Sequence, residues 1–137
     1  MKLRSLTPLD QDILWEMLLN AAHESDLAHV QQVPELAHYA QDWGQTGDCG
    51  CVAVVKDQAV GAAWVRLFTA ADPGYGFVSE EIPELAIAVL PEYRGQGIGT
   101  QLLSTLLAEV KKKRPAMSLS VRAGNPAIAL YKPMALT

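Results

Sequence analysis

The sequence predicts an α/β protein with a mixed, mostly antiparallel central sheet and flanking helices. Three observations support this prediction: strand-like and helix-like segments alternate along the chain, two adjacent strands have a hairpin pattern, and a glycine-rich turn joins a strand to a long amphipathic helix. The chain has 137 residues, of which 50% are hydrophobic, so it carries enough apolar side chains for a core of its own. We therefore expect a single domain over residues 1–137.

The first two elements are a strand and a helix. Residues 2–6 alternate between polar and apolar side chains, which is typical of a strand. Thr7 then favours a helix start, because Pro8 suits the first helical position and Asp10 nearly completes a capping box. Apolar residues at helical spacing form the predicted buried stripe of this helix: Ile13, Leu14, Met17, Leu18 and Ala21.

A polar segment and a second helix come next. Residues 24–32 are mostly polar, and we expect a loop there. Pro34 then starts a short helix that Gly44 ends. The predicted apolar side of this helix consists of Leu36, Tyr39, Ala40 and Trp43.

An antiparallel hairpin is predicted in the middle of the chain. Residues 51–55 and 59–68 have strand character and are joined by a turn at residues 56–58. Gly61 weakens the second strand and indicates a bulge. Residues 69–82 follow as a long loop, and loops of that length in a compact domain are usually functional or mobile.

The most informative stretch is the strand, turn and helix over residues 83–110. Apolar residues alternate with small alanines over residues 85–89, in a strand that Pro91 ends because proline cannot donate to a ladder. Glycines then occupy positions 95, 97 and 99, and apolar residues at helical spacing predict a helix behind them. The basic run at residues 111–114 is interpreted as the solvated end of that helix.

The glycines suit an anion site at the helix start. They let the backbone approach a bulky anion, while the helix N-terminus offers unpaired N–H donors and partial positive charge. A pyrophosphate fits this description, with Arg94 as a cation and Thr100 as a hydroxyl in the first turn. Other phosphate loops do not match: a Walker loop needs a Lys before its Ser or Thr, and a dinucleotide fingerprint needs its third Gly where Thr100 stands.

The stretch resembles the acetyl-CoA loop of the GCN5-related N-acetyltransferase (GNAT) family, which has the pattern Arg/Gln-x-x-Gly-x-Gly/Ala. The residues that carry the resemblance are Arg94, Gly95, Gln96, Gly97, Ile98 and Gly99, with Thr100 behind them. The segment from Asn125 to Tyr131 resembles the family's Asn-x-x-Ala-x-x-Leu-Tyr signature. The predicted order of strands and helices also matches the family, so the resemblance spans nearly the whole chain.

The resemblance implies an acetyl-CoA-dependent transferase that moves acetyl to a primary amine of a small molecule or peptide, by direct attack in a ternary complex. Acetyl-CoA would be the cosubstrate, and no metal is implied. The sheet is expected to splay between the strands at residues 84–90 and 117–121, with the pantetheine arm in the gap. By resemblance, the backbone of Ile87, Ala88 and Val89 pairs with that arm, Asn125 bonds it, and Tyr131 serves as general acid near the sulfur.

A base is needed because an amine is protonated at neutral pH. Glu84 is the best candidate, since it stands at the head of the central strand beside the expected cleft. Glu80 and Glu81, on the preceding loop, are alternatives. The alternative interpretation, that Glu84 is a solvated carboxylate at the strand end without a catalytic role, also stays open.

The sequence departs from the family at its C-terminal end. The family follows the Tyr with Leu-Gly-Phe and two more strands, whereas residues 132–137 here have another sequence, so we expect the final hairpin to be missing. That would expose the strand at residues 117–121 as an edge, and we expect a homodimer that covers it, unless the chain is truncated. The missing hairpin also leaves a second class of function open, that of a non-catalytic acyl-CoA-binding or sensing module.

Composition and charge limit which classes of partner and which cellular location we expect. The formal net charge of −4 gives no electrostatic support for a nucleic-acid partner and favours a cationic amine. No apolar run is long enough to span a membrane, and the acidic N-terminal residues are unlike a signal peptide, so we expect a cytoplasmic protein. Cys49 and Cys51 are interpreted as two reduced cysteines in or beside a strand, because a bridge between them would be strained.

Overall fold

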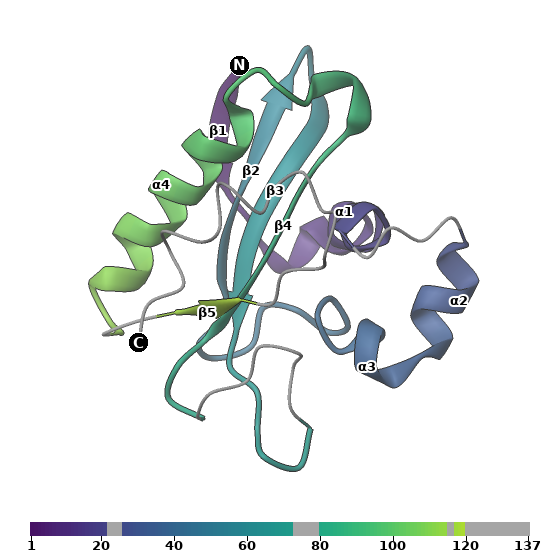
Figure 1. The fold of residues 1–137 in the computed structure, drawn as a ribbon, viewed down its shortest axis with the longest axis vertical. Helices are drawn as coiled ribbons and strands as arrows, with labels where there is room; N and C mark the ends of the chain where they lie inside the picture. The colour runs from purple at the N-terminus through teal and green to yellow at the C-terminus, as the bar shows by residue number, and fades with distance from the viewer. Residues whose placement is uncertain (22–25, 73–79, 115–116, 120–137) are drawn as a thin grey trace.

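The fold was analysed in a computed structural model that describes residues 1–21, 26–72, 80–114 and 117–119. One sheet has its strands in the order β1-β2-β3-β4-β5 (Figure 1). Neighbouring strands from β1 to β4 are antiparallel, and β4 and β5 are parallel. The predicted mixed, mostly antiparallel sheet is therefore confirmed. The elements are β1 (Lys2–Ser5), η1 (Pro8–Asp10), α1 (Gln11–Ala21), α2 (Leu27–Gln32), α3 (Pro34–Ala37), β2 (Cys49–Val55), β3 (Gln58–Arg66), β4 (Glu84–Val89), η2 (Pro91–Tyr93), α4 (Ile98–Lys111) and β5 (Ser118–Leu119).

Helices cover both faces of the sheet (Figure 1). On one face, Leu14 and Met17 of α1 pack with the fully buried Trp64 of β3. On the other face, Leu102 and Leu106 of α4 pack against the alternate side chains of β2, β3 and β4. Successive side chains of a strand point to opposite faces of the sheet, so the strands contribute to one hydrophobic core on each face.

The predicted helix start at Thr7 is confirmed. The Thr7 N–H donates to Asp10 Oδ2 at 2.8 Å, and the Leu9 N–H donates to Thr7 Oγ1 at 3.2 Å, which forms a capping box. Arg4 on β1 adds two hydrogen bonds to the Asp10 carboxylate, each 2.9 Å long. These bonds from the Arg4 guanidinium hold the pKa of Asp10 below its ordinary value.

The loop predicted over residues 24–32 is wrong in its described part, where α2 forms. Asp26 caps this helix by accepting a hydrogen bond from the Ala28 N–H at 3.0 Å. Val30 is fully buried against the α1 side of the core. A single buried side chain in a six-residue helix gives no amphipathic pattern, so the hydrophobic periodicity of the sequence did not indicate a helix here. The helix predicted from Pro34 is also shorter than expected and continues as turns through residue 42.

The hairpin is confirmed with small shifts. Lys56 and Asp57 both have positive φ (51° and 65°) and form a two-residue turn, so Gln58 already belongs to β3. Ala53 pairs with Gly61 and Val54 with Ala59, which places a bulge at the predicted position beside Gly61. The two cysteines are free; Cys51 is buried in the core on the α4 side, and the partly buried Cys49 packs against that core. Burial raises the pKa of the Cys51 thiol to about 11.

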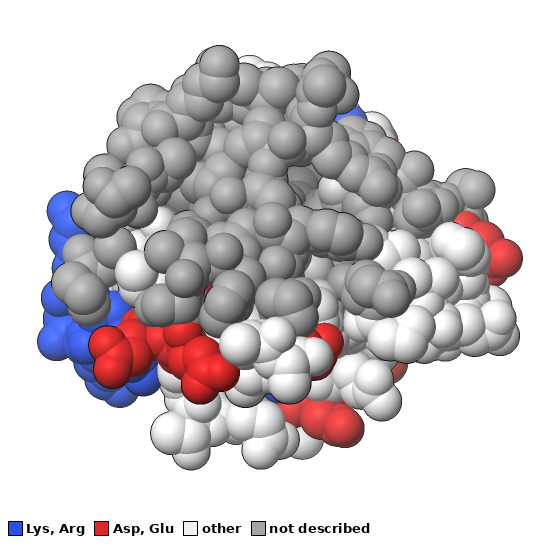
Figure 2. Space-filling view, turned by 60° about the horizontal axis from the view of Figure 1, so that its bottom comes forward, with Lys and Arg blue, Asp and Glu red and all other residues white. Residues whose placement is uncertain are grey.

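The long helix α4 ends where the sequence predicts. Lys111, Lys112 and Lys113 are exposed at its C-terminal end, and Lys112 Nζ lies 3.2 Å from a Glu109 carboxylate oxygen. Figure 2 shows Lys and Arg side chains gathered on one side of the face drawn, beside acidic ones. Of the strand predicted over residues 117–121, Ser118 and Leu119 form β5, and residues 120 and 121 lie outside the described part.

Candidate functional site

The glycine-rich loop joins β4 to α4 through the short helix η2. Gly95 and Gly97 have φ angles of +77° and +81°, in the left-handed region that glycine adopts without strain. Gly97 is the N-cap of α4 and offers no side chain to its first N–H groups. The first N–H groups of this 14-residue helix have no intrahelical acceptor, and no side chain caps them.

The space in front of the loop is open. A Cβ atom built on Gly95 or on Gly97 meets no heavy atom of the described residues within 4 Å. Gly95, Gln96 and Gly97 are exposed, whereas Ile98 is buried and fixes the helix start to the core. The backbone at Gly95 and Gly97 is therefore accessible from this side, and a side chain at either position would project into the space in front of it.

Arg94 is tied to the end of the strand that precedes the loop. Its Nε donates to the Val89 carbonyl oxygen at 3.0 Å, and its side chain is exposed. Thr100, in the first turn of α4, is exposed as well. The structure therefore brings together the loop residues that the sequence selected, with a cation beside the open backbone.

The strand β4 leads from this loop to Glu84. Ile87, Ala88 and Val89 pair with β3, and the described pairing with β5 covers Glu84 and Leu85. β4 has six residues, so its two ends are about 17 Å apart in an extended strand. The loop and Glu84 thus lie at opposite ends of one straight element.

Glu84 is buried rather than solvated. Glu84 is only 2% exposed, and the Tyr39 hydroxyl donates a hydrogen bond to Glu84 Oε2. Tyr39 comes from the turn that follows α3. The sequence identified Tyr39 only as a core residue; a buried tyrosine usually needs a hydrogen-bond partner, but the sequence does not reveal which one.

The alternative bases differ in setting. Glu80 and Glu81 are exposed, and Glu80 Oε2 accepts a hydrogen bond from the Ala70 N–H at 2.9 Å. The predicted site residues Asn125 and Tyr131 lie outside the described residues. Among the residues that the structure describes, no group of three or more His, Cys, Asp or Glu side chains is arranged to hold a metal ion.

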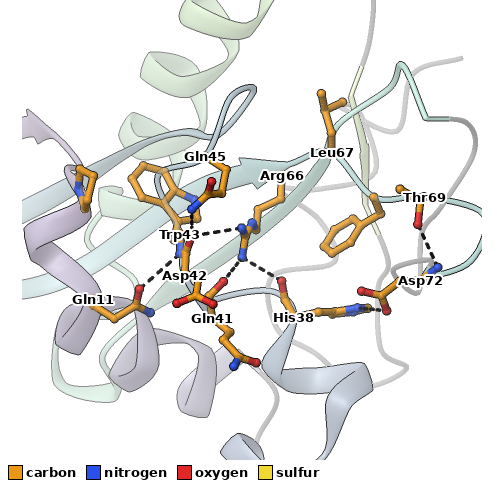
Figure 3. Close-up of a pocket in the computed structure, with 12 residues that line it drawn as sticks. Gln11, His38, Gln41, Asp42, Trp43, Gln45, Arg66, Leu67, Thr69 and Asp72 are labelled. Carbon is orange, nitrogen blue, oxygen red and sulfur yellow. Dashed lines mark hydrogen bonds and ion pairs between the residues drawn. The ribbon is translucent and has the colours of Figure 1, made fainter.

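Figure 3 shows a polar pocket of ≈ 860 Å³ whose lining includes Arg66, the residue paired with Glu84 across β3 and β4. None of the described residues that line it belongs to the glycine loop. His38, the residue before Tyr39, lines it and contacts Asp72 through Nδ1 at 2.9 Å. The rings of His38 and Tyr39 are 4.7 Å apart, and both contact Phe68. The Tyr39–Glu84 pair is therefore one residue removed from the pocket wall.

The pocket shows two features that the sequence did not predict. Gln11 and Arg66 reach across it to the backbone of the turn after α3 (Figure 3). The buried Nε2 of His38 has no hydrogen-bond partner among the described residues. These contacts join segments that are far apart in the chain, and no spacing rule reveals them.

Comparison with known proteins gives the family. Residues 14–135 match the acetyltransferase (GNAT) family, and the chain belongs to that family. No curated protein matches it in sequence. Among the described residues, no helix combines the length and hydrophobicity needed to cross a membrane.

Solved structures with the same fold are acetyltransferases. A ribosomal-protein-alanine N-acetyltransferase from Brucella melitensis is 28% identical, with a TM-score of 0.63 over 97% of this chain and 82% of its own. The aminoglycoside N-acetyltransferase AAC(6')-Iy, in complex with CoA, is 15% identical, with a TM-score of 0.65 over 99% and 87%. A GCN5-related N-acetyltransferase from Ralstonia eutropha JMP134 is 18% identical, with a TM-score of 0.65 over 99% and 92%.

Proposed function

We propose that this chain transfers acetyl from acetyl-CoA to a primary amine of a small molecule or peptide, by direct attack in a ternary complex. One observation carries the proposal: β4 has an open anion loop at one end and a buried, hydrogen-bonded carboxyl group at the other. The GNAT family membership supports it, and so do the fold neighbours that acetylate aminoglycosides or a ribosomal protein.

In this proposal, the loop and β4 hold the cosubstrate. The pyrophosphate binds the backbone in front of Gly95 and Gly97 and is flanked by Arg94, with Gln96, Ile98, Gly99 and Thr100 completing the loop. The pantetheine arm follows Ile87, Ala88 and Val89 toward Glu84, with Asn125 as a further contact. A backbone N–H of β4 bonds the thioester carbonyl as negative charge develops on its oxygen.

The proton transfers are assigned to two side chains. A protonated amine gives one proton to Glu84, directly or through water, and its nitrogen then attacks the thioester carbon. The new N–C bond forms as the C–S bond breaks. The second amine proton ends on the sulfur of CoA, with Tyr131 as the proposed acid.

Two assays test the proposal in sequence. Acetyl-CoA should raise the melting temperature, because a ligand that binds only the native state stabilises it by mass action. Release of the CoA thiol is then measured across polyamines, aminoglycosides, amino acids and peptides with free amino termini, against the spontaneous rate. A melting shift without turnover of any amine would support the non-catalytic acyl-CoA-binding module instead, and no shift would contradict both functions.

A further inference from the structure

The turn after α3 is held from outside by three side chains. The carbonyl oxygens of five consecutive residues, 38–42, each accept a hydrogen bond from a side chain of another element. Trp64 Nε1 donates to the Tyr39 carbonyl at 2.8 Å, and Gln11 Nε2 donates to the Ala40 carbonyl. Arg66 donates to the other three, those of His38, Gln41 and Asp42. The conformation of the turn therefore depends on these partners.

The local sequence explains why outside partners are needed. The helix α3 has four residues, too few to be stable alone, and its Leu36 and Ala37 carbonyl groups accept hydrogen bonds from N–H groups of the turn that follows. Asp42 has a φ of +54°, which a non-glycine residue adopts only at a cost in free energy. The turn thus has little intrinsic stability, and the contacts to α1 and β3 supply what it lacks.

Arg66 makes the largest share of these contacts. Its side chain is 13% exposed and forms an ion pair at 3.2 Å with Asp48, whose side chain is 3% exposed. Asp48 in turn accepts hydrogen bonds from the N–H groups of Gly44 and Gln45, at 2.8 and 2.9 Å. The guanidinium fork therefore fixes both ends of the segment from His38 to Asp48, as Figure 3 shows for its first part.

The same segment carries the hydroxyl that meets Glu84. Arg66 stands directly opposite Glu84 in the β3–β4 register, so one strand pair positions both the carboxylate and the residue that holds the turn. Tyr39 lies between two of the carbonyl groups that Arg66 binds, those of His38 and Gln41. A displaced turn would lengthen the Tyr39–Glu84 hydrogen bond, and hydrogen bonds weaken steeply with poor geometry.

We propose that Arg66 is a positioning residue for the reaction, acting through the turn that places the Tyr39 hydroxyl on Glu84. The inference rests on the proposed function only where it concerns turnover. Lysine is the informative replacement, because its single ammonium keeps the charge but cannot reach the acceptors that the guanidinium fork spans. Arg4 offers a matched control, since its fork binds Asp10 from the edge strand β1, two strands away from β3, and none of its hydrogen bonds among the described residues reaches the turn after α3.

The first test needs no turnover. Urea unfolding midpoints are measured for the natural chain, Tyr39→Phe, Arg66→Lys and the double variant, with Arg4→Lys and its combination with Tyr39→Phe as controls. Tyr39→Phe removes only the hydroxyl, so it should lower the midpoint in the natural chain and in Arg4→Lys, and much less in Arg66→Lys. An equal decrease in all three backgrounds would overturn the proposal.

The second test uses turnover of whichever amine the chain acetylates. Arg66→Lys should lower kcat by about ten- to a hundredfold with an unchanged KM for acetyl-CoA, whereas Arg4→Lys should leave kcat unchanged. Because a hydrogen bond from Tyr39 favours an ionised carboxylate, Arg66→Lys and Tyr39→Phe should both move the acid limb of kcat/KM to higher pH. The double variant should match Tyr39→Phe; additive losses would contradict the proposal. A chain without turnover would refute the proposed function, and the unfolding midpoints would still decide the role of Arg66.

Discussion

The Tyr39 hydroxyl donates a hydrogen bond to the Glu84 carboxylate, across 45 positions of the chain. Both residues are buried, with exposures of 6% and 2%. A buried carboxylate that accepts an oriented hydrogen bond is more typical of a functional group than of a solvated strand end, because burying an ionisable group costs free energy. This contact supports Glu84 as the proposed base over the exposed Glu80 and Glu81.

We predict that Glu84→Gln lowers the acetylation rate at neutral pH by roughly a hundredfold to ten-thousandfold, the usual contribution of a general base. Acetyl-CoA affinity should persist, since the loop is at the other end of β4. The loss should shrink at high pH, where the free amine needs no base. Thiol-release kinetics across pH measure this effect, with Glu81→Gln as the control. An unchanged rate at neutral pH would move the role to Glu81, Glu80 or water.

The loop gives a second prediction, at Gly97. Asparagine tolerates the left-handed conformation, so Gly97→Asn should keep the fold while its side chain enters the open space in front of the loop. We expect acetyl-CoA affinity to fall at least about tenfold, ~1.4 kcal/mol. Calorimetric titration measures the affinity, and the melting temperature without ligand checks the fold.

Gly47→Asn serves as the control for that experiment. Gly47 also has a positive φ, of +93°, and its new Cβ would come within 2.6 Å of Leu67 Cδ1, the flexible end of a side chain that can turn away. Its acetyl-CoA affinity should match that of the natural chain. Equal affinity in Gly97→Asn would show that the glycine loop is only a connector.

The start of the first helix gives a prediction on stability. Asp10 accepts hydrogen bonds from Arg4 and from the Thr7 N–H, and its pKa is lowered from 3.8. A lowered pKa stabilises the fold above pH 3.8, and that contribution is lost as pH falls through the folded-state pKa. Asp10→Asn should therefore lower the unfolding free energy by about 1 kcal/mol at pH 7, with a smaller difference in acid.

Denaturant unfolding from pH 7 down to well below pH 3.8, where the folded-state carboxylate takes up its proton, measures this difference. Asp12→Asn is the matched control, because Asp12 is exposed in the first turn of α1. A constant difference between Asp10→Asn and the natural chain across this range would mean that the Arg4–Asp10 contact contributes nothing to stability.

The buried thiol of Cys51 gives a prediction for the stability of the fold at alkaline pH. Burial raises its pKa from 9.0 to about 11, so above pH 9 the unfolded chain releases a proton that the folded chain keeps. Stability should fall there, with a slope from this thiol of at most ~1.4 kcal/mol per pH unit. The stability difference between the natural chain and Cys51→Ala should narrow between pH 9 and pH 11. A difference independent of pH would contradict the buried, protonated thiol.

Local chemistry explains which parts the sequence could predict. The Thr7 cap, the hairpin and the glycine-rich turn between β4 and α4 each depend on residues within a few positions, and all three elements form as predicted. The helix α2 was missed because Val30 alone marks its buried side. The Tyr39–Glu84 and Arg66–His38 contacts join positions 45 and 28 apart, and only the packing of the turn against the sheet reveals them.

In the proposed reaction, acetyl moves from acetyl-CoA to an amine nitrogen. Acetyl-CoA labelled in the acetyl group is incubated with the chain and the amine panel, and the label is followed by mass spectrometry. We predict that the label appears on an amine in amide linkage, faster with the natural chain than with Glu84→Gln. Label found only in free acetate, or left entirely on CoA, would contradict the proposed transfer.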